Sequence, residues 1–423
     1  MAGLQGLDSN LLKTISTKFK NTDSKDMVYD RTKKIECVGT GSTNINLAID
    51  SDRDHVGVLI KGKMTESSGL ESSGKSTLLY SSAAEAKKAG WVGILIDSEG
   101  SWDAQYGAAL GLEEDEKFRV FQPVTSEDTE ILINMLFGLG KGNQKTKTKI
   151  DYVLWDSITA TSPADLLNTE DSTGIGASKG VHARLWSNLI RKLNKIAISE
   201  NVAFAFINQI RNKMDLSSQY QEKVVKTENS LAAGFSSDNG KTTTGGMAIR
   251  YFMSLRLFLQ QTKRLKEERS IRGKAVTTKS RLNYIRVDVI KNKVSIPFKT
   301  ATTAIQFGVG YRDELPQFDY LVELKNGTIT SSTTGVYGFS YGGVELSIKG
   351  LPNLQKALFT KHRKTLEAAY VYFKKEEYTE LYEVSKDIED DLLDEDLGED
   401  EEDLYIDTPK PKRKKRTTRN KRR

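Results

Sequence analysis

The sequence predicts an α/β fold with a mostly parallel central sheet. From about residue 56 to about residue 300, short apolar runs alternate with segments of helical periodicity, as happens when helices connect parallel strands. The later runs at 255–259 and 284–290 follow each other with little helix between them, which predicts antiparallel strands at one edge. Ligands of such sheets bind beyond the carboxyl ends of the parallel strands, and a glycine-rich loop follows an early strand here.

That loop, Gly69–Ser76, reads GLESSGKS and fits the phosphate-binding pattern G-x-x-x-x-G-K-[ST]. Its glycines let backbone N–H groups turn inward around a phosphate, while Lys75 supplies a mobile cation and Ser76 offers a hydroxyl to Mg²⁺. A helix predicted at about 76–89 points its N-terminal dipole at the anion. The upstream copy of ESSG, residues 66–69, lacks the Gly-Lys step, so we expect it in the strand that enters the loop.

Polar side chains follow three predicted strands at their carboxyl ends: DSE at 97–99, DS at 156–157 and NQ at 208–209. Asp156 is the better candidate to hold Mg²⁺ through water. Glu99 then suits the orientation or deprotonation of an attacking water, and the Gln209 amide can sense a γ-phosphate. Each residue alone is compatible with a capping role. Together, after a phosphate loop, they predict a site for nucleotide hydrolysis.

Composition excludes several classes of protein. The 423 residues suffice for two or three domains, and 37% hydrophobic with 28% charged residues is typical of a charged, water-exposed surface. The sequence has no apolar run of the roughly 18 residues that a membrane span needs and no signal-peptide core. The single cysteine, Cys37, cannot form an internal disulfide, and the three histidines are scattered, so no zinc site is predicted. We expect a cytoplasmic protein that does not contact membranes.

The net charge of +6 conceals a split near the C-terminus. Residues 387–407 are dominated by Asp and Glu, whereas residues 410–423 are almost purely basic. Neither block has apolar residues to bury, which predicts a disordered acidic-then-basic tail over 384–423. The basic end suits electrostatic contact with phosphate backbones, a solubility appendage is the plain alternative, and PKRKKR also fits a nuclear import signal.

Several segments occur in a recognisable order from about residue 39 to about residue 307: GLESSGKST, ILIDSEGSWDAQYGAALG, DYVLWDSITA, RLWSNLIRKL, AFINQIRNKM, TTTGGMAIRYF and VIKNKVSIPFK. In this order they resemble the RecA family of homologous recombinases, of bacterial or bacteriophage type. INQIR followed by TTTGG distinguishes this resemblance from other ATPases with the same core.

The resemblance implies a DNA-dependent ATPase that forms filaments on single-stranded DNA and exchanges strands with a homologous duplex in recombination and repair. Its implied partners are both DNAs, further copies of this chain, and single-strand-binding or loader proteins. It implies an N-terminal helical oligomerisation segment at 1–45, a RecA-type ATPase core at 46–307 and a small α+β C-terminal domain at 308–383, ahead of the tail.

The resemblance also assigns roles by matching position. Residues that bind ATP and Mg²⁺ would be Gly69, Glu71, Ser72, Ser73, Gly74, Lys75, Ser76, Thr77, Asp103, Tyr106 and Asp156. Ser76 and Asp156 would hold the metal, and Tyr106 and Asp103 match positions that stack on and hydrogen-bond the adenine. The catalytic set would be Glu99, Lys75, Gln209, Lys291 and Lys293. In the family, the two lysines reach the nucleotide of the neighbouring subunit, and the glutamine couples the γ-phosphate to the second DNA-binding loop.

Two DNA-binding loops are implied at about 165–180 and 210–243, the second much longer than usual in the family. The implied DNA-binding residues are Arg184, Ser187, Arg191, Arg211, Gly245 and Gly246. The first three share one side of a helix predicted at 182–200. Such contacts address phosphates, so binding should be nearly independent of sequence and sensitive to salt.

Two other functions are compatible with the same residues. A hexameric helicase-like DNA motor shares the core, but it needs an arginine finger where this chain has Lys291 and Lys293. A regulatory DNA-binding protein without ATPase activity is the other, and the intact Lys75, Glu99 and Asp156 count against it.

Overall fold

The computed structural model describes residues 35–52, 56–139, 149–161, 175–212, 241–243, 246–271 and 274–395. The chain forms two units, residues 1–375 and residues 376–423. Of the second unit, the structure describes residues 376–395, which are helical. Among the described residues, no helix combines the length and the apolar character needed to cross a membrane. The predicted N-terminal helix up to residue 34 and the tail after residue 395 lie outside the described residues.

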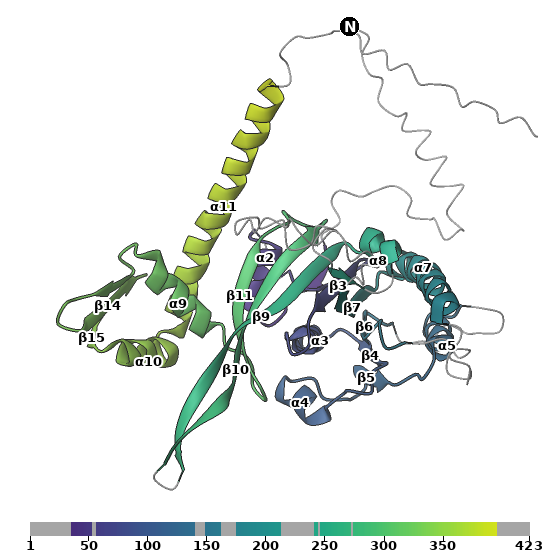
Figure 1. The fold of residues 1–423 in the computed structure, drawn as a ribbon, viewed down its shortest axis with the longest axis horizontal. Helices are drawn as coiled ribbons and strands as arrows, with labels where there is room; N and C mark the ends of the chain where they lie inside the picture. Colours follow the sequence, from purple (N-terminus) through teal and green to yellow (C-terminus); the bar gives the residue numbers. More distant parts are fainter. Residues whose placement is uncertain are drawn as a thin grey trace, which may run out of the picture. The chain divides into compact units, whose positions relative to one another are not determined.

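The strands of the central sheet are β3 (Met64–Gly69), β4 (Gly93–Asp97), β5 (Phe118–Phe121), β6 (Tyr152–Asp156), β7 (Ala203–Asn212), β8 (Lys241–Thr243), β9 (Leu255–Ile271), β10 (Lys274–Asn292), β11 (Thr300–Gln306) and β12 (Gly310–Tyr311). Their order is β12-β11-β10-β9-β3-β7-β6-β4-β5, and β8 pairs with β7 (Figure 1). The strands from β9 to β5 run parallel to one another, whereas β10, β11 and β12 are antiparallel additions. The predicted mostly parallel sheet with an antiparallel edge is therefore confirmed. A separate pair joins β1 (Cys37–Val38) to β2 (Leu59–Ile60).

Strand β3 is polar and yet fully buried. Its sequence is MTESSG, and all of its residues are buried. Two of its polar side chains are satisfied inside the sheet, because the Ser68 hydroxyl donates to the Leu257 carbonyl at 3.1 Å and the Glu66 carboxylate pairs with Arg256. Buried polar groups need such partners. The expectation that the first ESSG copy forms the strand entering the loop is confirmed.

The helices around the sheet are α2 (Thr43–Ile49), α3 (Lys75–Lys88), α4 (Ala104–Ala109), α5 (Ser126–Leu136), α7 (Ile175–Glu200) and α8 (Gly246–Phe252). Side chains of α5, α7 and α8 pack with the sheet in one cluster that includes Trp155, Trp186 and Phe204. The helices predicted at about 76–89 and 127–139 are confirmed, with slightly different ends. Because these helices pack against the sheet, the loops meet at the carboxyl ends of the parallel strands.

Helix α7 begins at Ile175, earlier than the predicted start at residue 182. Residues 175–180, predicted as the end of the first DNA-binding loop, are therefore helical, and they include Gly176 and Gly180. Buried side chains further along α7 anchor the helix, and each residue added to an existing helix gains a hydrogen bond that offsets a glycine cost of about 1 kcal/mol. The rest of that predicted loop, up to residue 174, lies outside the described residues.

The elements after the sheet are α9 (Glu314–Leu324), β13 (Ile329–Ser331), β14 (Val336–Tyr341), β15 (Val344–Lys349), α10 (Leu351–Lys361) and α11 (Arg363–Glu395). The three strands form their own antiparallel sheet. They share a second apolar core with the helices, in which Phe318, Phe339, Leu354 and Leu366 are buried. The segment therefore combines helices with an antiparallel sheet.

Three details of this region differ from prediction. A single strand was expected over 337–346, but Gly342 and Gly343, with φ of 58° and 78°, form a turn that divides it into the β14–β15 hairpin. A single helix expected over 354–373 is two helices that meet at His362. The tail predicted as disordered from residue 384 is helical to residue 395, as a continuation of α11, because extending an existing helix avoids the cost of nucleation.

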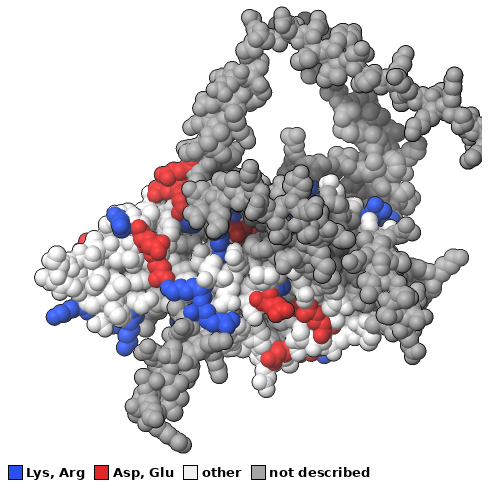
Figure 2. Space-filling view, in the orientation of Figure 1, with Lys and Arg blue, Asp and Glu red and all other residues white. Residues whose placement is uncertain are grey.

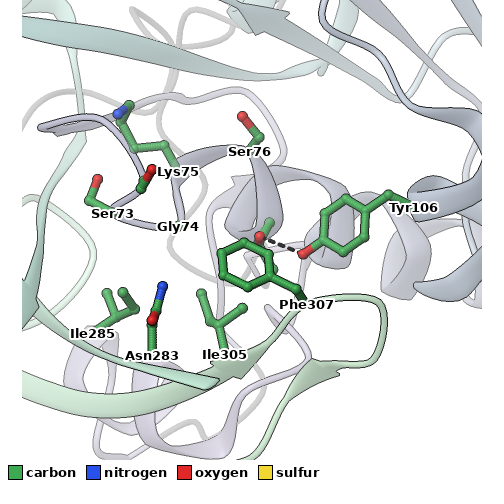
Figure 3. Close-up of a pocket in the computed structure, with 11 residues that line it drawn as sticks. Ser73, Gly74, Lys75, Ser76, Tyr106, Asn283, Ile285, Ile305 and Phe307 are labelled. Atoms are coloured by element: carbon green, nitrogen blue, oxygen red, sulfur yellow. Dashed lines mark hydrogen bonds between the residues drawn. The ribbon is translucent and has the colours of Figure 1, made fainter. Parts of the chain in front are cut away.

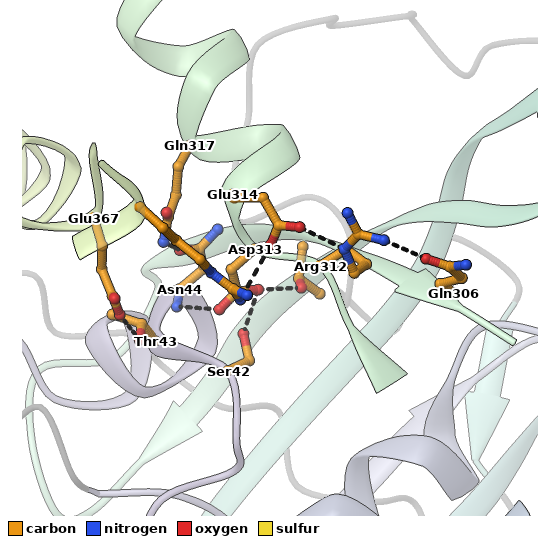
Figure 4. A network of polar contacts seen from close by, with 11 residues as sticks. Ser42, Thr43, Asn44, Gln306, Arg312, Asp313, Glu314, Gln317 and Glu367 are labelled. Atoms are coloured by element: carbon orange, nitrogen blue, oxygen red, sulfur yellow. Dashed lines mark hydrogen bonds and ion pairs between the residues drawn. The ribbon is translucent and has the colours of Figure 1, made fainter. Parts of the chain in front are cut away.

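A buried polar network joins α2 to the beginning of α9 (Figure 4). The Asp313 carboxylate accepts hydrogen bonds from the Ser42 hydroxyl at 2.9 Å, from the Thr303 hydroxyl at 2.5 Å and from the Asn44 backbone N–H at 3.3 Å. Burial raises the pKa of Asp313 to about 6, although these donors oppose the shift. Beside it, Glu314 pairs with Arg312 and with Arg363, the latter at 3.2 Å.

The raised pKa of Asp313 predicts that the stability of the protein depends on pH. Its native pKa of about 6 exceeds the ordinary value of 3.8, so its stabilising contribution is complete below pH 3.8 and is lost as the pH rises to about 6. The shift corresponds to about 3 kcal/mol. We expect the free energy of unfolding of the wild type, relative to D313N, to fall by about this amount between pH 4 and pH 7. Urea denaturation of both proteins measures it, and a constant difference across that range would contradict the assignment.

Candidate nucleotide and DNA site

The phosphate loop connects β3 to α3 with backbone angles that favour glycine. Gly74, the N-cap of α3, has φ of 89°, and Ser72 has φ of 57°. A Cβ on Gly74 would lie 2.5 Å from Ile305 Cδ1, and a Cβ on Gly69 would lie 2.3 Å from the Leu259 carbonyl oxygen. Gly69 is therefore required by the close approach of the β9 backbone, and Gly74 by its left-handed backbone conformation.

Lys75 rests on the loop itself. Its ammonium group donates to the carbonyls of Gly69 at 3.1 Å and Leu70 at 2.7 Å. Burial lowers the pKa of Lys75, while the negative charges of Asp156 and Glu99 oppose the shift. The Ser73 hydroxyl is buried without a hydrogen-bond partner among the described residues. A phosphate in the loop would provide an acceptor for both groups.

The predicted metal residues lie together. The Ser76 hydroxyl donates to Asp156 Oδ2 at 2.8 Å, and the Tyr80 hydroxyl donates to the same oxygen at 3.3 Å. Burial, with smaller effects of Glu99 and Asp97, raises the pKa of Asp156 to about 6. A cation at this place would offset that burial of negative charge.

The two strand-end aspartates, Asp97 and Asp156, are neighbours in register on β4 and β6, but their contacts differ. Asp97 accepts from the backbone N–H groups of Ser101 at 3.1 Å and Trp102 at 3.0 Å, and from the Gln122 amide at 2.8 Å. Its oxygens are thus occupied in holding the next loop. Asp156, bonded only to hydroxyls among these contacts, remains the better metal candidate.

Glu99 lies where the ends of β4, β6 and β7 meet. Its Oε1 atom accepts from the Gln209 amide at 2.9 Å and from the Ser157 hydroxyl. The structure therefore brings Glu99 and Gln209 together as predicted. Ser157 was missed as a site residue, although the DS pair at the end of β6 was the signal that could have identified it.

A pocket of about 210 Å³ opens beside the loop (Figure 3). It is lined by Ser72, Ser73, Gly74, Lys75, Ser76, Thr77, Tyr106, Asn283, Ile285, Ile305 and Phe307. The Tyr106 and Thr77 hydroxyls are 2.6 Å apart, which fixes the ring at the rim. Asp103 caps α4, accepting from the backbone N–H groups of Gln105 at 2.9 Å and Tyr106 at 3.1 Å, and does not line the pocket.

The four pocket residues from the antiparallel strands and the turn after them were not predicted as site residues. They are Asn283, Ile285, Ile305 and Phe307, which lie more than 200 positions from the loop along the chain. In the sequence only the run at 284–290 marked this region, and such a run indicates a strand without indicating what its faces contact.

Lys291 and Lys293 do not line this pocket. The Lys291 ammonium donates to the carbonyls of Arg250 at 2.6 Å and Tyr251 at 3.1 Å in the last turn of α8, where a cation is favourable. Burial lowers the pKa of Lys291, and the nearby Lys293 adds to the effect. Lys293 is exposed. Both side chains therefore lie away from the nucleotide loop of their own chain.

The predicted DNA-binding residues are only partly within the described side chains. On α7, Arg191 is exposed and Ser187 is half-buried. Gly246 begins α8, whereas Gly245 and the side chains of Arg184 and Arg211 lie outside the described residues. In the view of Figure 2, basic and acidic side chains are interspersed over the described surface. That face alone does not identify a DNA track.

The second predicted loop is shorter than 210–243. Its ends form antiparallel strands, with Ile210 paired to Thr243 and Asn212 paired to Lys241. The predicted segment therefore begins and ends in strand, because β7 continues beyond its apolar segment through backbone pairing with β8, which a hydrophobic pattern does not report. Residues 213–240 lie outside the described residues.

Comparisons with known proteins agree on one family. The model of the RecA N-terminal domain matches residues 7–312. The chain is similar to Protein RecA of Nautilia profundicola, 32% identical over 359 residues that cover 83% of this chain and 88% of that protein. It is 32% identical to Protein RecA of Geobacter sulfurreducens (78% and 82% covered) and 29% identical to that of Bacteroides thetaiotaomicron (84% and 95% covered).

Proposed function

The chain belongs to the RecA family, and on that premise we propose that its loop at Gly69–Ser76 binds ATP with Mg²⁺ and that a neighbouring copy completes the site. It is an ATP-dependent DNA recombinase of homologous recombination and repair, and a DNA-dependent ATPase. As a family member it binds DNA and self-assembles into filaments. The hexameric motor is not favoured by these relatives.

The observation that carries the proposal is the hydrogen bond between Gln209 and Glu99. Glu99 is the proposed catalytic carboxylate, and Gln209 lies on β7, which pairs with β8 across the second DNA-binding loop. A γ-phosphate that attracted the Gln209 amide would therefore pull on the strand that supports the loop. Nucleotide state and DNA binding would be linked through this single side chain.

Each proposed nucleotide residue has one role. The loop residues Glu71, Ser72, Ser73 and Gly74 surround the phosphates, and Lys75 bonds the β- and γ-phosphates. Ser76 and Asp156 hold Mg²⁺, which would neutralise charge developing on the phosphate oxygens. The described residues contain no cluster of three or more His, Cys, Asp or Glu, and a Mg²⁺ site built from one hydroxyl, one carboxylate and phosphate oxygens needs none.

The proposed catalytic step uses Glu99 to orient or deprotonate the attacking water. Ser157 and Gln209 hold its carboxylate from two neighbouring strands. Lys291 and Lys293 act on the nucleotide of the adjacent subunit, in agreement with their absence from the pocket of their own chain. Hydrolysis then depends on assembly, because a lone chain lacks these two cations at its phosphates.

Tyr106 and Asp103 are proposed to recognise the adenine, and the structure adds Phe307 to this end of the site. Phe307 is 46% exposed and lines the pocket that also contains Tyr106 (Figure 3). An exposed aromatic ring beside a second aromatic ring suits stacking on a base. Both backbone contacts of Asp103 go to Oδ1, so its Oδ2 can accept a hydrogen bond from the adenine while the cap of α4 stays in place.

DNA contacts are proposed for Arg184, Ser187 and Arg191 on α7, and for Arg211, Gly245 and Gly246 around the second loop. The segment limits 1–45, 46–307, 308–383 and 384–423 remain proposals, as do the roles of the terminal segments. Single-strand-binding and loader proteins are proposed partners.

The proposed function is tested by hydrolysis and microscopy with the full chain. We expect ATP hydrolysis to rise at least about tenfold on adding single-stranded DNA, and electron microscopy to show filaments with ATP and DNA together. A hydrolysis rate unaffected by DNA, or rings in place of filaments, would contradict it. Exchange of strands with a homologous but not a heterologous duplex separates recombination from simple DNA binding.

A further inference from the structure

A buried ion pair crosses the sheet just before the phosphate loop. Glu66 on β3 is fully buried, and its carboxylate accepts from Arg256 Nε on β9 at 2.5 Å and from Asn208 Nδ2 on β7 at 2.7 Å. Buried ion pairs often add little or no net stability compared with apolar residues of similar volume. The stability of the fold therefore gives little reason for a carboxylate, an amide and a guanidinium at this place.

One end of this cluster adjoins the proposed nucleotide sensor. Asn208 is followed directly by Gln209, whose amide donates to Glu99 at 2.9 Å. Adjacent strand residues point to opposite faces, so the two side chains are coupled through the backbone of β7. Ser68 and Gly69 of β3 are in register with this pair, which ties the same place to the phosphate loop.

The other end adjoins α8, which follows the second DNA-binding loop. Arg256 lies at the beginning of β9, shortly after α8, and is the cross-strand partner of Lys291 on β10. Lys291 in turn caps the last turn of α8 through the carbonyls of Arg250 and Tyr251. Arg256 Nη2 is buried without a hydrogen-bond partner in the described part of the chain. A shift of the Arg256 side chain could therefore give this N–H donor an acceptor that it lacks here.

The cluster lies on the face of the sheet that α7 and α8 cover. Glu66 is in register with Phe206, and Phe206 packs in the same apolar cluster as Trp186 of α7 and Ile249 of α8. Removing either partner from a fully buried carboxylate is strongly destabilising. The three side chains must therefore keep their contacts, and move together, whenever β7 or α8 shifts.

We propose that Glu66, Asn208 and Arg256 form a polar relay that couples nucleotide occupancy to DNA affinity. They are positioning residues: none of them lines the nucleotide pocket. The relay transmits a displacement of Gln209 from β7 through Glu66 to Arg256 and thence to α8. This inference rests on the proposed function, since it presupposes that ATP and DNA bind at the places named above.

The test measures a coupling factor, defined as the ratio of the dissociation constants for a fluorescent single-stranded oligonucleotide without and with a non-hydrolysable ATP analogue. We expect E66Q and R256K to lower this factor about tenfold relative to wild type. Analogue affinity without DNA should stay within about twofold of wild type. Because coupling is reciprocal, the factor by which DNA tightens analogue binding should fall equally.

A matched control separates coupling from stability. D151N removes the charge from a second ion pair, in which Lys61 is buried and Asp151 is half-buried. Neither residue lines the nucleotide pocket. We expect D151N to lower the melting temperature but to keep the coupling factor. An equal loss of coupling in D151N would overturn the relay, because any loss of stability would then suffice.

A milder variant covers the case in which E66Q does not fold. N208S removes the hydrogen bond from β7 to Glu66 and leaves the Glu66–Arg256 pair in place. If the coupling factors of N208S and R256K stayed within about twofold of wild type, the relay would be overturned but the proposed function would not. If the DNA affinity of the wild-type chain were the same with and without the ATP analogue, both the proposed function and the relay would be overturned.

Discussion

E99Q is expected to lower DNA-stimulated ATP hydrolysis by at least about a hundredfold while nucleotide binding stays near that of wild type. The substitution keeps the size of the side chain, and a Gln carbonyl still accepts from the Ser157 hydroxyl and the Gln209 amide. What it removes is the negative charge and the basicity that water activation needs. The loss should therefore appear in kcat, with filaments that persist on DNA because ATP is bound and not consumed.

S157A is the matched control for E99Q. It removes one of the two hydrogen bonds that orient the Glu99 carboxylate but leaves its charge, so we expect a loss of about tenfold or less. Phosphate-release kinetics and titration with a fluorescent nucleotide measure both variants. E99Q hydrolysis within about threefold of wild type would show that another group activates the water.

The part of the fold that sequence predicts best is the part with a strong local signal. The phosphate loop is a dense motif, and the apolar runs of β4, β6 and β7 are long enough to be recognised as buried strands. Because parallel strands end at one edge, the sequence alone predicts that Glu99, Asp156 and Gln209 lie together. The observed contacts agree with that placement.

Two features resisted prediction because they depend on pairing between distant segments. The pocket wall formed by Ile285 and Ile305 comes from antiparallel strands that approach Gly74 only in three dimensions. The ladder between β7 and β8 shortens the second loop through backbone hydrogen bonds, to which side-chain patterns are insensitive. Register and long-range pairing are tertiary properties, whereas periodicity is a local one.

The polar strand β3 shows a third reason why prediction from sequence fails. A buried parallel strand should be apolar, and MTESSG is not. Arg256 and Asn208 resolve part of the contradiction, because they satisfy Glu66 from the strands on either side. The Thr65 and Ser67 hydroxyls of β3 are buried without a hydrogen-bond partner among the described residues. Departures from a local rule are expected at sites with a functional demand, and this departure lies next to the loop that binds nucleotide.

K75A is expected to reduce ATP hydrolysis below detection and to weaken nucleotide binding at least about tenfold. In the structure the Lys75 ammonium is partly buried near Asp156 and Glu99 and, within the described part of the chain, donates to the carbonyls of Gly69 and Leu70 alone. An approaching triphosphate offers a stronger acceptor than these carbonyls, so the side chain should transfer to it. Without Lys75 the phosphates would meet two carboxylates with one compensating cation fewer.

K75R tests whether charge alone suffices. Its guanidinium keeps the positive charge but is planar and larger than the ammonium, which donates to the Gly69 and Leu70 carbonyls. We therefore expect K75R to recover part of the nucleotide affinity and little of the hydrolysis rate. K75A and E99Q then fail in different ways, since E99Q should hold nucleotide and DNA tightly, whereas K75A should hold neither. K75A hydrolysis within about tenfold of wild type would place the phosphates somewhere other than this loop.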